Sequence, residues 1–253
     1  MASLINLSPS DLFFNKDIYI NDKLSIHCPT IREVLNYGER KYWSVIYCLT
    51  ANSYDFRVEF HDAGKDYETI SDYEVFIDVL LNVLSPEDCS LIFNGLKFDK
   101  NCLYKHKETG DLIISDGNVI IDRAIHSLIA KVLKSMHYIK KEFKRGGNAH
   151  TKKYLIEKEK KRREVEQRLQ LMNNRNVNFK SELFNYITVV LSKTSIWNAE
   201  TIQDASLFAV MAIAKRLMKE KEFDNTMTGL YSGSIDGKKI SLNKIHWASD
   251  LTD

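Results

Sequence analysis

The sequence predicts an α+β fold dominated by helices, with a mixed α/β N-terminal half, a long charged connecting helix and a helical C-terminal half. The chain of 253 residues holds only 3 Pro and 10 Gly, which favours regular elements over long loops. Short apolar runs typical of antiparallel strands are confined to the first half. Between Lys140 and Arg175, thirteen Lys/Arg stand against five Asp/Glu, in a chain whose net charge is only +2.

The composition is that of an ordinary folded protein, with 44% hydrophobic and 28% charged residues. The N-terminus lacks a basic segment followed by an apolar run, and nowhere do eighteen apolar residues follow one another. We therefore expect a cytoplasmic location and no membrane partner. The cysteines show no metal-binding spacing and lie among apolar residues, which favours reduced, packed thiols at Cys28, Cys48, Cys89 and Cys102.

The first elements are a hairpin and a capped helix. Over residues 17–27, apolar residues alternate on both sides of an Asn-Asp pair, which predicts a β-hairpin. Thr30 and Glu33 form the T-x-x-E pattern of a capping box, and apolar residues follow it at helical spacing to Leu49. Because glycine costs a helix about 1 kcal/mol against alanine, we expect a bend or close packing at Gly38.

The next segments mix strands and helices. Phe56, Val58 and Phe60 alternate with polar residues, which predicts a strand, followed by a polar loop to residue 68. Ser71 and Glu74 form a second capping box, which predicts a helix to residue 84. Three further apolar runs predict strands at 90–98, 102–106 and 111–115, and apolar spacings of three and four predict a helix over 119–137.

The rest of the chain is predicted to be helical, in two parts. Gly146 and Gly147 precede the basic run and can act as a helix cap or a hinge. Helices are expected over 179–191 and 200–221, and a tail over 227–251 is expected to be pinned by its apolar side chains. The predicted division is a mixed α/β domain at 1–145, a basic helix or linker at 146–176 and a helical domain with a pinned tail at 177–253.

The basic run is the strongest compositional signal. Pairs at spacings of four, with the acid first, indicate an exposed single helix: Glu157 with Lys161, Glu159 with Arg163, and Glu164 with Arg168. One interpretation is phosphate binding along nucleic acid. The favoured one is a solvated helix or arm that binds an acidic protein surface, because stacking aromatics are scarce here. The candidate electrostatic partner-binding residues are Lys152, Lys153, Lys158, Lys160, Lys161, Arg162 and Arg163.

No pattern of residues indicates catalysis, a cofactor or a metal. The glycines form neither a P-loop nor a dinucleotide-binding fingerprint, and the seven histidines are scattered. His61 and Asp62, with Asp66 and Glu68, fit a solvated acidic loop better than a metal cluster, because no second histidine follows at helical spacing. We therefore expect a protein that is not an enzyme.

Aromatic and apolar residues supply a second set of candidate partner-binding positions. Four aromatic residues crowd the helix that begins near Thr30, and most of them are expected to be core. Tyrosine and tryptophan also dominate the binding energy of protein interfaces. The candidates of this kind are Tyr42, Trp43, Tyr231, Ile235 and Trp247.

Three segments carry a family resemblance: PTIREVLNYGERKYWSVIYCLT, HTKKYLIEKEKKRRE and MTGLYSGSIDGKKISLNKIHWASDL. A helix with GE-x-x-Y, a TKK-x-LIE basic helix and a closing YSG-x-ID-x-KK…W occur in that order along most of the chain. In this the chain resembles proteins encoded by tailed phages and prophages of Gram-positive bacteria. The resemblance implies a role in virion morphogenesis, as a tail assembly chaperone or a minor tail component, and carries over no catalytic residue.

Two functions from different classes are therefore expected. The leading one is a non-enzymatic phage protein of the host cytoplasm, or incorporated in the virion, that binds other phage tail or virion proteins. A further expected partner is a second copy of the chain itself, in a homo-oligomer. The alternative is a nucleic-acid-binding accessory protein that uses the basic helix over residues 152–168.

Overall fold

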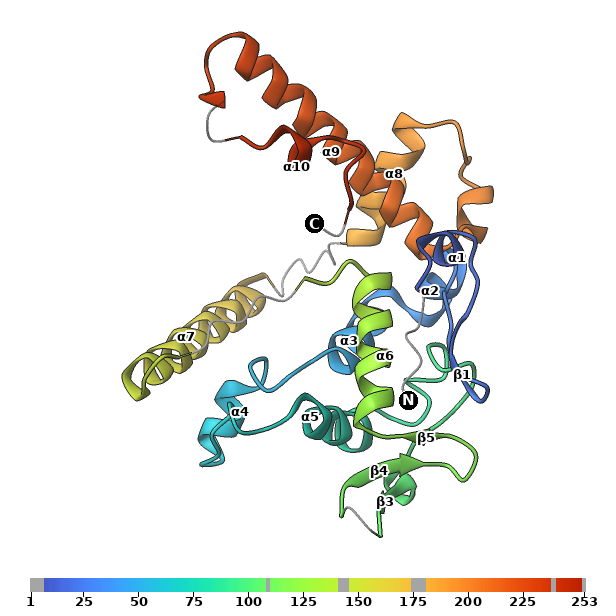
Figure 1. Cartoon of the computed structure of the whole chain (residues 1–253), viewed down its shortest axis with the longest axis vertical. Helices are drawn as coiled ribbons and strands as arrows, with labels where there is room; N and C mark the ends of the chain where they lie inside the picture. Colours follow the sequence, from blue (N-terminus) through green and yellow to red (C-terminus); the bar gives the residue numbers. More distant parts are fainter. Residues whose placement is uncertain (1–6, 108–109, 141–145, 174–180, 238–239, 252–253) are drawn as a thin grey trace.

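The computed structural model describes residues 7–107, 110–140, 146–173, 181–237 and 240–251, and it has the predicted helix-dominated α+β architecture (Figure 1). The described residues form ten α-helices and two small antiparallel sheets. The α-helices are α1 (Pro9–Phe13), α2 (Ile31–Tyr37), α3 (Glu39–Leu49), α4 (Arg57–Asp62), α5 (Asp72–Asp78), α6 (Arg123–Met136), α7 (Ala149–Asn173), α8 (Glu182–Lys193), α9 (Leu207–Tyr231) and α10 (Leu242–Ile245).

The predicted hairpin and the two capping boxes are confirmed. Strands β1 (Ile18–Asn21) and β2 (Leu24–Ile26) pair antiparallel. In the turn between them, the Asn21 side chain accepts hydrogen bonds from the backbone N–H groups of Lys23 and Leu24. Thr30 caps α2 with Glu33, and Ser71 caps α5 with Glu74, each in the reciprocal geometry of a capping box. A π-helical turn, Val79–Val83, extends α5 to the predicted end of the helix.

Gly38 divides the first predicted helix into α2 and α3. Its φ is +97°, a value that side chains with a Cβ rarely adopt, so the chain turns there between the two helices. The expected bend is therefore a complete break in the helix.

Two predicted strands are wrong. The alternating segment near residue 56 forms helix α4, because Phe56 and Phe60 also fit a spacing of four and their rings lie 6.4 Å apart. The segment 90–98 forms turns instead of a strand. The two other predicted strands are confirmed, in a sheet of three strands ordered β3 (Leu103–Lys105), β4 (Leu112–Ser115) and β5 (Ile120–Ile121).

Two predicted helices begin too early in the sequence. The apolar residues at 119–121 belong to β5 and its approach, and α6 begins only after Asp122, whose side chain accepts the Ile125 N–H at 2.8 Å. A 3-10 turn, Thr201–Asp204, precedes α9, which is capped by Ser206 and runs ten residues beyond the predicted end. A 3-10 turn, Lys100–Cys102, likewise precedes β3.

One large apolar core joins the two ends of the chain. It takes in side chains from α1, the hairpin, α3, α5, the second sheet and α6, together with Leu183 and Val190 of α8 and the first two turns of α9. Apolar residues of the predicted first and third segments therefore share one core, while α7 lies outside it; the three-part division stays a prediction.

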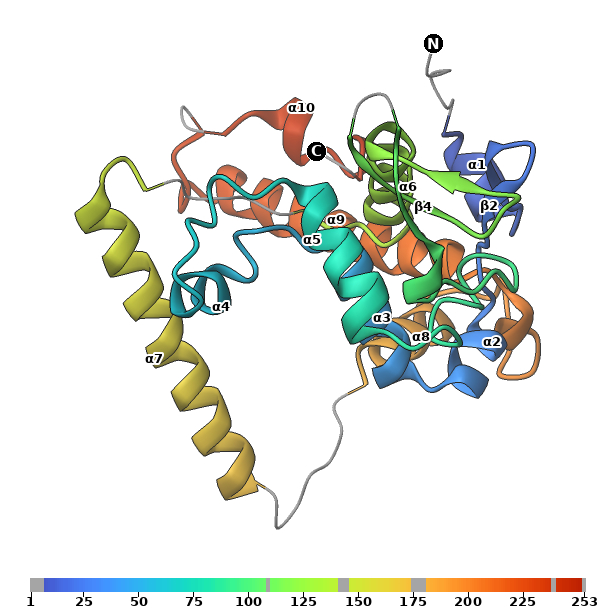
Figure 2. The ribbon, with the colours of Figure 1, turned by 90° about the horizontal axis from the view of Figure 1, so that it is seen from below.

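Two elements project from this core (Figures 1 and 2). Helix α7 extends to one side, next to α4, and the outer half of α9 extends to another side with the end of the chain folded back along it. Within the described ranges, no helix is both long and apolar enough to cross a bilayer. The four cysteines are free thiols, as predicted, and Cys28 and Cys89 are buried.

Candidate interaction surfaces

Helix α7 binds an acidic segment of its own chain, which comprises residues 55–68. Lys152 Nζ lies 2.9 Å from Asp66 Oδ2 and 2.7 Å from Glu68 Oε2. Lys160 Nζ lies 2.6 Å from Asp62 Oδ1. Two lysines, about two turns apart on α7, are thereby paired with carboxylates within the molecule.

Arg163 closes this row of contacts at its far end. Its guanidinium pairs with Glu59 of α4 and donates to the Asp55 carbonyl oxygen at 3.1 Å. It also lies 3.1 Å from Glu159, one of the three intrahelical pairs predicted from the sequence. The two other predicted pairs are not found among the ion pairs of the described residues.

A small apolar cluster lies beneath the ion pairs. Ile156 is only 5% exposed and packs with Val58 and Tyr67. The Tyr67 ring also meets Tyr54 edge-on, with centroids 5.4 Å apart. We call Lys152, Ile156, Lys160 and Arg163 the docked face of α7.

The docked charges shift one another's pKa values. Hydrogen bonds from Lys160 and His61 lower the pKa of Asp62, and a hydrogen bond from Lys152 lowers that of Asp66. Glu68 and Asp66 in turn raise the pKa of Lys152. Because these groups lie at the surface, solvent screens the pairs and each contributes little to stability.

The seven predicted basic residues therefore fall into three groups. Three of them, Lys152, Lys160 and Arg163, bind the acidic segment. Arg162 pairs with Glu159 and Glu166 on α7 itself. Among the described residues, the remaining lysines form no ion pair, and their side chains are exposed: Lys153, Lys158 and Lys161.

The acidic segment at residues 61–68 is solvent-exposed at Asp62 and Asp66, as expected, and its carboxylates also take part in these contacts. Asp62, Asp66 and Glu68 remain partly exposed, but each is an ion-pair partner of an α7 lysine. The sequence did hold a signal for this: residues 55–68 contain five Asp/Glu against two Lys/Arg, the opposite imbalance to that of the basic run.

Three of the predicted apolar candidates lie together on the second projection, which we call the C-terminal arm (residues 219–251). Tyr231 ends α9 and is 84% exposed. Ile235 folds back onto Gly229, where a Cβ would overlap its side chain, so the glycine lets the chain reverse closely. Trp247 is 45% exposed and stacks on His246.

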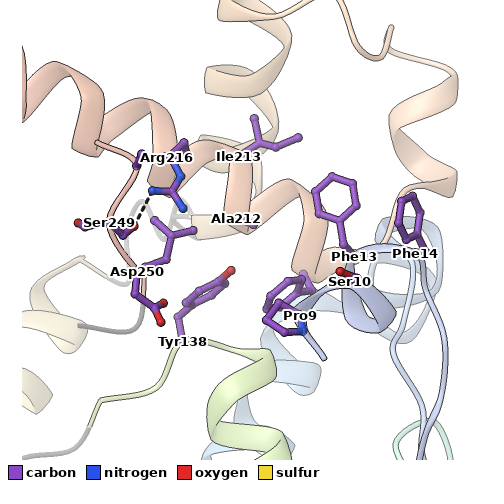
Figure 3. Close-up of a pocket in the computed structure, with 13 residues that line it drawn as sticks. Pro9, Ser10, Phe13, Phe14, Tyr138, Ala212, Ile213, Arg216, Ser249 and Asp250 are labelled. Atoms are coloured by element: carbon purple, nitrogen blue, oxygen red, sulfur yellow. Dashed lines mark hydrogen bonds between the residues drawn. The ribbon is translucent and has the colours of Figure 1, made fainter. Parts of the chain in front are cut away.

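The pinned tail predicted from the sequence is held mainly through its backbone. Arg216 of α9 donates to the carbonyl oxygens of Trp247 and Ser249, the latter at 2.7 Å (Figure 3). Lys219 donates to the Asp250 carbonyl oxygen at 2.6 Å. Because these bonds use main-chain oxygens, they fix the path of the tail without engaging the Trp247 side chain.

The anchored tail forms one wall of an open pocket of about 620 Å³ (Figure 3). Its other walls come from α1, the start of α9 and the loop that carries Tyr138, whose ring stacks on Phe208 with centroids 5.1 Å apart. Phe14, at its edge, is 71% exposed. No sequence pattern pointed to this pocket, because its walls are far apart along the chain.

The two remaining aromatic candidates lie elsewhere, on α3. Tyr42 is only 1% exposed, so it is a core residue and not a surface contact. Its hydroxyl lies 2.6 Å from His137 Nε2, and His137 Nδ1 donates to the Leu133 carbonyl oxygen. Burial lowers the pKa of His137 to about 4, so the neutral ring accepts the Tyr42 hydrogen bond. Trp43 packs partly buried beside this pair.

In the described part of the chain, no three His, Cys, Asp or Glu side chains are arranged to hold a metal ion. The arrangements that stand out are surfaces: the docked basic helix and the C-terminal arm.

One family model matches the chain, over residues 173–252, and it is described as the YomV second domain. The match covers about a third of the chain, including α8, α9 and the C-terminal arm. This is also the part that carries the closing YSG-x-ID-x-KK…W motif, and at a coarse level the match supports a protein of phage or prophage type. No curated protein and no solved structure matches the chain significantly.

Proposed function

We propose that this chain is a non-enzymatic phage protein that acts in virion tail assembly by binding other tail proteins, as a tail assembly chaperone or a minor tail component. The observation that carries the proposal is the C-terminal arm, which projects from the core within the region of the family match. The three segments that resemble phage proteins supply the assignment to the tail.

The arm has the chemistry of a protein-binding element. Tyr231 and Trp247 offer large amphipathic side chains to solvent, and such residues carry much of the binding energy of interfaces. Hydrogen bonds from Arg216 and Lys219 to the tail backbone hold the arm in one shape before it meets a partner. A pre-ordered surface loses less conformational entropy on binding, which favours affinity.

The test is co-expression of the full chain with the tail proteins of its phage, followed by pull-down. We expect at least one tail protein to be retained, and the double variant Tyr231→Ala/Trp247→Ala to lose it. Tyr19→Ala is the matched control, because Tyr19 is also an exposed tyrosine, 70% accessible, but lies on the β1 hairpin. Retention of no tail protein, or equal retention by the double variant, would contradict the proposal.

Nucleic-acid binding through α7 is the second candidate, and the exposed lysines Lys153, Lys158 and Lys161 favour it. The docked residues are already paired, so of the seven candidate basic residues these three have no ion-pair partner among the described residues and can neutralise phosphates. The logarithm of DNA affinity should then fall with the logarithm of salt concentration with a slope of about −3, at roughly 0.9 per phosphate. If changing all three lysines to Gln leaves DNA binding unaltered, this candidate fails.

A further inference from the structure

The side of α7 opposite its docked face carries a regular series of exposed side chains. They are separated by three or four residues and so line one stripe of the helix, which we call the outer seam: Tyr154, Lys158, Lys161, Val165 and Leu169. The three apolar members are 58%, 54% and 52% exposed. At 1.5 Å per residue the stripe is about 22 Å long.

The outer seam has no partner within the described molecule. The ion pairs and hydrogen bonds between α7 and the rest of the described chain end at Arg163, and the helix projects past that point (Figures 1 and 2). Val165 and Leu169 lie on this projecting part. A polar helix in solvent gains nothing from apolar residues aligned on one stripe, whereas a helix that binds a second helix does.

We infer that the outer seam binds an acidic amphipathic helix of a partner protein. The inference rests on the proposed function, because it names a surface and the chemistry of a partner for the same protein-binding role. The apolar residues at both ends of the seam match an apolar stripe on the partner. Lys158 and Lys161, between them, require carboxylates opposite the centre of that stripe.

A second copy of this chain fits the seam poorly. Two copies aligned in parallel bring both lysines against their own counterparts, and an antiparallel alignment still brings Lys161 next to Lys161 at the centre of the seam. Like charges held together across an interface cost affinity. Glu157 and Glu164 follow one edge of the seam only and do not reach the centre.

Nucleic acid also fits the seam less well than an acidic helix. Phosphates would bind the lysines but leave Val165 and Leu169 exposed, and Tyr154 is the only aromatic residue of the seam on which a base could stack. Charge complementarity together with the two aliphatic residues therefore favours a protein helix.

The test is fluorescence anisotropy with the full chain and three labelled ligands. The first is a synthetic 21-residue peptide with leucines at heptad positions a and d and glutamates at e and g. The second is a peptide of the same composition, scrambled so that no apolar stripe remains. The third is a duplex DNA of comparable length. We expect the striped peptide to bind at least about tenfold more tightly than the scrambled one, a difference of 1.4 kcal/mol.

Two single variants provide a matched pair. Lys158→Glu and Lys153→Glu change one exposed α7 lysine in the same way, but the two residues lie about 140° apart around the helix at 100° per residue. Lys158→Glu should weaken binding of the striped peptide about tenfold, and Lys153→Glu should change it less than about twofold. Circular dichroism establishes that both variants are folded.

Three results would overturn the inference: no binding of the striped peptide, equally tight binding of the scrambled peptide or the DNA, or equal losses in the two lysine variants. The pull-down with arm variants reads out the proposed function separately. Peptide binding without retention of any tail protein would refute the tail role and leave the seam in place. Retention of tail proteins without peptide binding would refute the seam as a helix-binding site and leave the tail role in place.

Discussion

Helices α7 and α9 have the same length, 25 residues, but they are held in opposite ways. The first two turns of α9, Leu207–Ala214, are almost entirely buried in the main core. Among the described side chains of α7 only Ile156 is buried, and surface ion pairs supply further contacts with the acidic segment. The position of α9 therefore depends on burial of apolar area over two turns, and that of α7 on one buried side chain together with surface ion pairs.

This difference predicts opposite responses to the same substitution. Leu207→Asp places a charge at a fully buried position of α9, and we expect it to cost more than about 5 kcal/mol and abolish the folded state. Leu169→Asp places the same charge at a position of α7 that is 52% exposed, where surface changes stay within about 0.5 kcal/mol. Urea denaturation followed by circular dichroism measures both. A folded Leu207→Asp protein would show that burial does not fix α9.

Acid should weaken the core before it releases α7. Burial, with a smaller contribution from Lys134, lowers the pKa of His126 to about 4. Between the ordinary value of 6.5 and 4, the unfolded chain binds a proton that the folded core does not, so stability falls as the pH falls. The loss is about 3 kcal/mol for this histidine. The pKa values of Asp62 and Asp66 are lowered by their hydrogen bonds to the lysines, so the pairs Lys160–Asp62 and Lys152–Asp66 persist to more acidic pH.

A variant isolates the contribution of His126. Its ring packs on Tyr73 and Phe76, and it makes no side-chain hydrogen bond among the described residues, so His126→Phe keeps the aromatic packing. Urea denaturation at pH 7 and pH 4.5 should show a smaller acid loss in this variant than in the parent. His150→Phe, at an exposed position of α7, is the control and should lose as much as the parent. If both variants lose the same stability between pH 7 and pH 4.5, protonation of His126 does not cause the acid sensitivity.

Salt should act on α7 and leave α9 unchanged. We expect Lys152→Gln/Lys160→Gln, or 0.5 M NaCl, to speed amide hydrogen exchange in α4 and in residues 149–163 by up to about tenfold, because the double variant removes three ion pairs and salt screens the same pairs. Exchange in Leu207–Ala214 should not change. The control variant Lys153→Gln/Lys158→Gln removes the same charge from unpaired positions. Equally fast exchange in this variant would mean that the loss of overall charge, and not the loss of docking, speeds the exchange.

Local signals in the sequence predicted the elements whose geometry is itself local. The capping boxes at Thr30 and Ser71 and the turn at Asn21 each satisfy nearby backbone groups, so the residue types alone are sufficient evidence. The segment around Phe56 was mistaken for a strand because apolar residues at 56, 58 and 60 fit a strand and also place 56 and 60 one helical turn apart.

The candidate surfaces depended more on long-range contacts. The basic run was recognisable from composition, but the pairing of Lys160 with Asp62 spans 98 positions and follows from no local rule. Tyr42 and Trp247 look alike as aromatic residues beside apolar neighbours, yet the fold buries one and leaves the other on the arm. Burial is a property of the assembled core, which the sequence does not display.

The smallest expected effect concerns the glycine pair that precedes α7. Gly146 is buried and donates its N–H to Glu68 Oε1 at 3.2 Å, and a Cβ there would meet the Lys152 side chain and lie 3.0 Å from the Lys152 backbone nitrogen. The backbone would have to shift near the first docked lysine. We expect Gly146→Ala to weaken docking by less than about 1 kcal/mol, a few-fold rise in the exchange rate of α4 amides.

Gly147→Ala separates this close contact from the general effect of losing a glycine. Nothing lies within 4 Å of a Cβ at Gly147, which is exposed, so its replacement reduces the freedom of the unfolded chain without disturbing the docked lysine. Exchange in α4 should therefore be unchanged or slower in Gly147→Ala and faster in Gly146→Ala. If both variants speed exchange equally, the pair acts as a flexible hinge; if neither does, the position of Lys152 does not depend on the close approach at Gly146.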